Sequence, residues 1–182
     1  PLTRATEPSD SSRSVAFVSD IHVGSNNFLL KQWEKMTSWL KGSWKEEGIE
    51  YMVVSGDIVD GIGVFPNQEE ELEIEDLFLQ YERLAELLKD VPDGIRMVVQ
   101  PGNHDAVRPA EPQPTFSSRI TDLFDSSIMF VGNPCYLEIE GRTILTYHGR
   151  SMDDLISSIQ PLSYETPIEA MKEMLKRRHL SP

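Results

Sequence analysis

The N-terminal part of the chain contains the stretch VAFVSDIH at residues 15–22, in which a short apolar run leads into Asp and His. The same order recurs in YMVVSGDIVD at residues 51–60 and in IRMVVQPGNHD at residues 95–105. Short β-branched runs bounded by Gly and Pro are typical of buried strands. In all three stretches the polar residues follow the apolar run. We therefore predict three buried strands, each with chemically versatile side chains just after its carboxyl end.

Helical patterns separate these strands. Apolar residues at three- and four-residue steps indicate amphipathic helices over residues 28–45 and 77–88. We expect further helices near residues 117–124, 153–159 and 167–178, and strands over 127–131, 135–139 and 142–147. Glu140-Gly141 is a candidate tight turn between the last two strands. Alternating strands and helices imply parallel pairing, and parallel sheets bind ligands beyond their carboxyl ends. The sequence therefore predicts an α/β protein whose polar clusters meet at one edge of the sheet.

Length and charge limit the classes of function. The 182 residues suit about one domain, and the single cysteine, Cys135, excludes an internal disulfide. With 17 Lys and Arg against 30 Asp and Glu, the net charge is −13, which argues against binding nucleic acid by bulk charge. Bound cations could still attract phosphate. The apolar runs are shorter than the ~18 residues that a membrane span needs, and the start does not resemble a signal peptide. Composition therefore predicts an acidic intracellular protein.

The polar clusters combine carboxylate oxygens with imidazole nitrogens, a donor set that suits Mn, Fe or Zn. None of them contains cysteine, so a thiolate site is not expected. Taken singly, each cluster also has a structural explanation: Asp57 could cap a helix, Asn103 and His104 could be turn residues, and His148 could be a buried histidine at a strand end. His179, near a helix end, is read as a partner of the helix dipole. However, three of the four histidines follow strands beside Asp, Asn or Gly, and this joint occurrence favours a functional site.

The order Asp-X-His, Gly-Asp-X-X-Asp, Gly-Asn-His-Asp and a later His resembles the calcineurin-like metallophosphoesterases. The resemblance implies a β-sandwich core flanked by helices, with two divalent metal ions at the ends of the strands, Mn first and Fe or Zn as alternatives. It also implies a role for each matching residue. Asp20 and His22 would hold the first metal, Asp57 would bridge both, Asn103 and His148 would hold the second, His104 would face the scissile phosphate as a general acid, and Asp60 would orient His104.

The sequence departs from the family pattern at two places. Gly61 stands where many protein phosphatases of this superfamily carry a phosphate-binding Arg, which favours a phosphodiesterase. No Gly-His-X-His follows His148, although the family takes one ligand for each metal from that motif. We therefore expect residues 1–14 to be a leader or linker, and residues 15–182 to be a metallophosphoesterase domain whose C-terminal part is missing from an excerpted chain.

A closer resemblance links residues 18–25, 55–61, 100–105 and 146–151 to the small subunits of archaeal family D DNA polymerases. It implies a 3′→5′ exonuclease domain for proofreading, acting on a single-stranded 3′ end of DNA, with a large catalytic subunit as partner. It also implies an archaeal cytoplasmic protein associated with the nucleoid. Two alternatives stay open: another metallophosphodiesterase that acts on small substrates, and a non-catalytic scaffold subunit of the polymerase.

Three further side chains are candidates for substrate contacts. Arg150 follows His148 closely and could contact phosphate or form a structural salt bridge. Phe65 and Phe116 could stack on bases, or could belong to the core or to a lid.

Overall fold

The computed structural model describes residues 12–178, which form two compact units. One unit is Ser12–His148, and the other begins at Gly149. The second unit contains α4 (Met152–Ser158) and α5 (Pro167–Arg177). Their bounds lie within one residue of the helices predicted over residues 153–159 and 167–178. The first strand begins at Ser14, the last residue of the segment predicted to be a leader or linker, and residues 1–11 lie outside the described part.

The larger unit is built on a parallel four-stranded sheet. Its strands are β1 (Ser14–Val18), β2 (Ile49–Ser55), β3 (Arg96–Gln100) and β4 (Met129–Phe130), in that spatial order. Residues Val18 and Val54 are paired in register, as are Val54 and Val99. The ends of the first three strands therefore lie side by side, and the predicted parallel pairing is confirmed.

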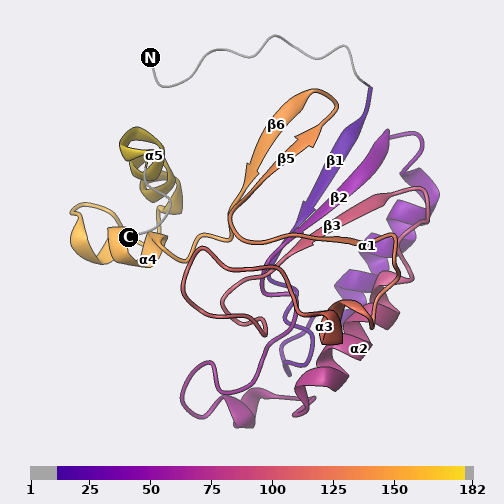
Figure 1. Cartoon of the computed structure of the whole chain (residues 1–182), viewed down its shortest axis with the longest axis horizontal. Helices are drawn as coiled ribbons and strands as arrows, with labels where there is room; N and C mark the ends of the chain where they lie inside the picture. Colours follow the sequence, from indigo (N-terminus) through magenta and orange to yellow (C-terminus); the bar gives the residue numbers. More distant parts are fainter. Residues whose placement is uncertain (1–11, 179–182) are drawn as a thin grey trace. The chain divides into compact units, whose positions relative to one another are not determined.

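Two helices cover one face of this sheet. They are α1 (Leu30–Ser43) and α2 (Leu77–Leu88), which Figure 1 shows together on one side of the strands. Alternate residues of a strand point to opposite faces. Met52 and Val54 thus belong to the helix-side core, with Leu40 of α1 and Leu84 of α2. The predicted helix over residues 28–45 is two residues shorter at each end.

The opposite face is covered by an antiparallel hairpin of β5 (Cys135–Ile139) and β6 (Arg142–Thr146). Glu140 and Gly141 form its two-residue turn, both with positive φ, as a primed hairpin turn requires. Val53 and Val98, whose side chains point away from the helices, are buried with Leu137 and Ile139 of the hairpin. The central strands β2 and β3 are therefore enclosed on both faces, whereas the edge strand β1, predicted to be buried, leaves Phe17 57% exposed. The mixed α/β class is confirmed.

Two short elements complete the larger unit, η1 (Gln68–Glu71) and α3 (Ser118–Thr121). The helix predicted over residues 117–124 is thus only one turn long, and the strand predicted over 127–131 keeps two residues. Within residues 12–178, no helix is both long enough and apolar enough to cross a membrane.

Candidate metal centre and active site

The candidate site lies just beyond the carboxyl ends of β1, β2, β3 and β6. Backbone pairing continues past the strands, because Asp20 N–H donates to the Gly56 carbonyl at 3.0 Å and His22 N–H donates to the Asp57 carbonyl at 3.0 Å. These two bonds hold the loop after β1 against the loop after β2. The first two sequence motifs are thereby brought together by main-chain hydrogen bonds.

Three of the predicted ligands have an uncommon backbone conformation. Asp20, His22 and Asp57 have φ values of 55°, 52° and 50°. A non-glycine residue in this left-handed region is strained by roughly 1–2 kcal/mol, and such residues cluster at functional sites. The fold thus holds three carboxylate and imidazole side chains in positions that ordinary extended or helical backbone would not give them.

Asp57 is the centre of the cluster, and only 4% of its surface is exposed. Its Oδ2 lies 3.2 Å from His148 Nε2 and 3.8 Å from His22 Nε2, and its Oδ1 accepts the His104 backbone N–H at 2.8 Å. Asn103 Oδ1 lies 3.2 Å from His148 Nε2, and Asp20 Oδ1 lies 3.9 Å from His22 Nε2. One carboxylate therefore faces donor groups on two sides.

The site contains two overlapping groups of donor atoms, and within each group the atoms lie within 4.8 Å of one another. One contains His22, Asp57 and His104, and the other contains Asp20, Asp57 and His148. Asp57 is common to both, which is the geometry expected of a bridging carboxylate. These groups divide the ligands differently from the family pattern, which pairs Asp20 with His22, so the assignment of each ligand to one metal stays a prediction.

The two candidate imidazole ligands are oriented by their second nitrogen. His148 Nδ1 lies 3.0 Å from the Ser55 carbonyl, and His22 Nδ1 lies 3.0 Å from Asp60 Oδ1. With Nδ1 of each ring engaged in this way, Nε2 is the nitrogen that faces Asp57. Metal-ligating histidines are commonly held in this way by a carbonyl or carboxylate.

Two glycines make the close approach of these groups possible. A Cβ on Gly56, whose φ is 92°, would overlap the His148 ring, and a Cβ on Gly102 would overlap the Asp57 carboxylate. Gly61 has a φ of 74°, and a Cβ there would overlap the His104 carbonyl oxygen. The position that corresponds to the Arg of the phosphatase pattern thus has no room for a side chain in this chain.

The electrostatics of the pair Asp57 and His148 reflect their contact. Burial alone would raise the pKa of Asp57, but the hydrogen bond and charge of His148, with the His104 backbone N–H, hold it below its ordinary value. Burial alone would lower the pKa of His148, but the hydrogen bond and charge of Asp57 raise it to about 9. In the metal-free protein, His148 is therefore a cation paired with a carboxylate at neutral pH.

The raised pKa of His148 leads to a pH-dependent prediction. The protonated ring stabilises the metal-free fold fully below its unfolded pKa of about 6.5, and this stabilisation is lost as the pH rises through about 9. A cation must displace that proton to reach Nε2. We expect Mn²⁺ affinity, measured by calorimetry, to rise up to ~10-fold per pH unit between these two pKa values. His148→Gln should remove the slope, and an unchanged slope in this variant would assign the proton to another group.

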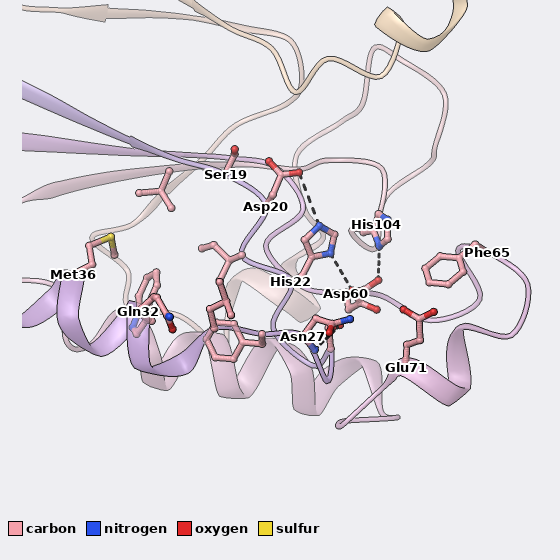
Figure 2. Close-up of a pocket in the computed structure, with 16 residues that line it drawn as sticks. Ser19, Asp20, His22, Asn27, Gln32, Met36, Asp60, Phe65, Glu71 and His104 are labelled. Carbon is pink, nitrogen blue, oxygen red and sulfur yellow. Dashed lines mark hydrogen bonds and ion pairs between the residues drawn. The ribbon is translucent and has the colours of Figure 1, made fainter. Parts of the chain in front are cut away.

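His104 contacts the main chain of Asp60 and not its carboxylate. Its Nδ1 lies 2.7 Å from the Asp60 main-chain carbonyl, whereas the Asp60 carboxylate faces His22 and Gln68. Figure 2 shows His22, Asp60 and His104 side by side in the cleft. The rings of His22 and His104 meet edge to face, with centroids 4.7 Å apart. Asp60 thus orients both rings, one by its side chain and one by its main chain.

Sequence reasoning did not find two buried glutamines that hold the loop after β2, at Asp60 and Gly61. Gln68 Nε2 donates to both the Asp60 carbonyl and Asp60 Oδ2 at 2.8 Å, and Gln80 bonds both main-chain polar groups of Gly61. Both side chains are fully buried. Gln80 interrupts the apolar stripe of α2, and a polar residue on a core-facing helix position is the one signal that could have pointed to it.

Asp105, the last residue of the Gly-Asn-His-Asp motif, ties two of the loops together. Its carboxylate accepts the Gly102 N–H at 2.7 Å and the Ile58 and Val59 N–H groups at 3.4 Å each. Burial, and then the charge of Asp57, raises its pKa to about 7 against the effect of these hydrogen bonds. The group therefore joins the loop after β2 to the loop after β3 without facing the cleft.

We expect Asp105→Ala to lower the free energy of unfolding by about 2–4 kcal/mol, because buried N–H groups lose their acceptor. Asp105→Asn retains one acceptor oxygen and should cost less. Denaturant unfolding of the two variants measures the difference. Equal losses would mean that the carboxylate acts through its volume rather than through these hydrogen bonds.

The remaining candidates lie in different surroundings. Phe116 is buried in the core against Tyr81 and Phe130, so it is not available for stacking on a base. Phe65 is partly exposed and lies beside His104, with ring centroids 6.2 Å apart. Arg150 belongs to the second unit, where its guanidinium lies 3.4 Å from Asp153. His179 lies outside the described residues.

Comparison with known proteins identifies the family of the chain. Residues 15–182 match the family of DNA polymerase alpha/epsilon B subunits, and the chain belongs to this family. It is similar to proteins named DNA polymerase II small subunit: 52% identical to that of Archaeoglobus fulgidus over 92% of the chain and 36% of the relative. It is 49% identical to that of Methanocaldococcus jannaschii, over 92% of the chain and 30% of the relative. It is 42% identical to that of Halobacterium salinarum, over 100% of the chain and 36% of the relative. The chain thus spans about a third of these relatives, and the resemblance to archaeal family D small subunits is confirmed.

Proposed function

We propose that this chain is the phosphodiesterase domain of an archaeal family D DNA polymerase small subunit, with a two-metal 3′→5′ exonuclease activity. The observation that carries the proposal is the position of Asp57, whose carboxylate lies between His22 Nε2 and His148 Nε2. A buried carboxylate between two oriented imidazoles has no evident structural purpose that a neutral side chain could not serve better.

The donor atoms fit two divalent cations. Asp20, His22 and Asp57 would hold one, and Asp57, Asn103 and His148 would hold the other. Oxygen and imidazole donors suit Mn²⁺, with Fe or Zn as alternatives. When bound, such cations lower the pKa of water and neutralise phosphate oxygens. The net charge of −13 opposes the approach of DNA, and this neutralisation would reduce the repulsion at the site.

His104 would act on the leaving group. In hydrolysis a water oxygen forms a bond to phosphorus, the bond from phosphorus to the 3′ oxygen breaks, and that oxygen takes a proton. The His104 Nδ1 lies against the Asp60 carbonyl at 2.7 Å, so its Nε2 is the nitrogen that would deliver the proton. The partly exposed ring lines the cleft (Figure 2), where it would face a bound phosphodiester.

A second candidate is a non-catalytic scaffold subunit. It is favoured by the family description and by the names of the relatives, which denote polymerase subunits and no hydrolytic activity. In this case too the partner would be a large polymerase subunit. The third candidate, a phosphodiesterase of small substrates, shares the site and differs only in substrate.

Calorimetric titration with Mn²⁺ of the protein assembled with the large subunit separates the first two candidates. The proposal predicts two sites that are lost in Asp57→Asn, whereas a scaffold has no need of them. Degradation of a 5′-labelled single strand by the protein assembled with the large subunit then tests the activity. Shortening from the 3′ end supports the exonuclease, and cleavage of bis(p-nitrophenyl) phosphate without degradation of DNA favours the small-substrate enzyme.

A further inference from the structure

The cleft beside His22 extends beyond the candidate metal ligands and along α1. Its volume is about 640 Å³. Figure 2 shows Asp20, His22, Asp60 and His104 in one part of it, with Gln32 and Met36 of α1 at the other side. Neither metal binding nor proton transfer uses this second part. We call it the α1 end and define it by six lining residues, Val18, Phe28, Leu29, Gln32, Trp33 and Met36.

The α1 end is apolar and partly open. Leu29 is 64% exposed although it lines the cleft, and Trp33, only 5% exposed, lies beneath the surface. The Trp33 indole N–H is buried and has no hydrogen-bond partner among the described residues. Gln32 adds an exposed amide that can donate and accept. Ligand sites commonly combine an apolar wall with a few such polar groups.

Charge determines what can enter. The acidic residues that line the cleft are Asp20, Asp60 and Glu71, and among the described residues no Lys or Arg lines it. A second phosphate group would therefore be repelled once it left the metal centre. A nucleobase is neutral, flat and largely apolar, and its edge carries donors and acceptors. It is the part of a nucleic acid that matches the α1 end.

We propose that the α1 end binds the unpaired base of the strand-terminal nucleotide whose phosphodiester lies at the metal centre. The inference rests on the proposed function, and it explains how the site would distinguish unpaired from paired strand ends. A base that is still paired with a template cannot enter the cleft, whereas an unpaired one can. Frayed or mismatched ends would then be cleaved in preference to paired ends, because they present a free base at the lowest cost.

The test uses the 182-residue chain without metal, so it does not depend on the metal centre. Thymidine is titrated while the methyl NMR signals of Leu29, Met36 and Leu79 are observed, with 2-deoxyribose as the base-free control. We expect thymidine, but not deoxyribose, to shift Leu29 and Met36 saturably. Leu79 should not respond, since it is similarly exposed (52%) but does not line the cleft.

Leu29→Ser should weaken thymidine binding by about 5-fold or more, and Leu79→Ser should leave it unchanged. Absence of shifts, or equal effects of both variants, would overturn the proposal. In a separate experiment with Ca²⁺ added, tetrathymidylate should displace thymidine. If Ca²⁺ is bound and thymidine is not displaced, the α1 end takes free nucleosides and not a strand end, which would overturn the proposal. Failure of the proposed function is read separately, as the absence of Mn²⁺ sites in the calorimetric titration of the protein assembled with the large subunit.

Discussion

Asp57→Asn is expected to abolish metal-dependent cleavage and to lower Mn²⁺ affinity by more than ~100-fold, beyond the ~10–100-fold typical of losing an outer-shell partner. The reason is that the Asp57 carboxylate faces both His22 and His148, so one substitution weakens both candidate metal positions. The remaining amide oxygen can still accept the His104 backbone N–H, so the loop after β3 keeps its anchor. Calorimetry and a nuclease assay measure the two effects.

The matched control is Asp93→Asn, which removes the same charge from an exposed position outside the site. It should keep wild-type metal binding. Thermal unfolding of both variants shows whether a loss of binding reflects the site or the fold. Full cleavage by Asp57→Asn would contradict the bridging role, and loss of binding in both variants would attribute the effect to net charge.

The general plan of the fold could be predicted because burial determines it. The runs that end at Val54 and Val99 are apolar at successive positions, which marks strands covered on both faces. The run that ends at Val18 has the same pattern but forms an edge strand, and its Phe17 is 57% exposed. The helices between the runs predict parallel pairing. The candidate ligands follow these strands directly. Their convergence could therefore be expected from position in the chain alone, without any knowledge of side-chain contacts.

The details that hold the site together could not be predicted in this way. The contact of His104 with the Asp60 carbonyl depends on the path of a loop, and no residue pattern reports a main-chain acceptor. Gln68 reaches Asp60 from a short 3₁₀ helix that has no sequence periodicity of its own. The left-handed backbone of Asp20 likewise arises from tertiary pairing, since local preference disfavours it.

His104→Ala is expected to retain Mn²⁺ and yet to lose about 10²–10⁴-fold in the rate of cleavage, the usual contribution of a general acid. Metal binding should survive because the contact between this residue and Asp57 is made by the His104 backbone N–H, which alanine keeps. His22→Ala is the contrasting variant. Its ring lies edge to face with that of His104, but its Nε2 faces Asp57, so it should lose metal as well as rate.

The leaving group provides the decisive measurement for His104. A 3′ alkoxide of DNA needs a proton as it departs, whereas p-nitrophenolate does not. The rate defect of His104→Ala should therefore be large on an oligonucleotide and small on thymidine 5′-p-nitrophenyl phosphate. Equal defects on both substrates would mean that His104 does not protonate the leaving group. The Nε2 of His104 would then bind the phosphate group itself, and this contact would contribute equally to the cleavage rate of both substrates.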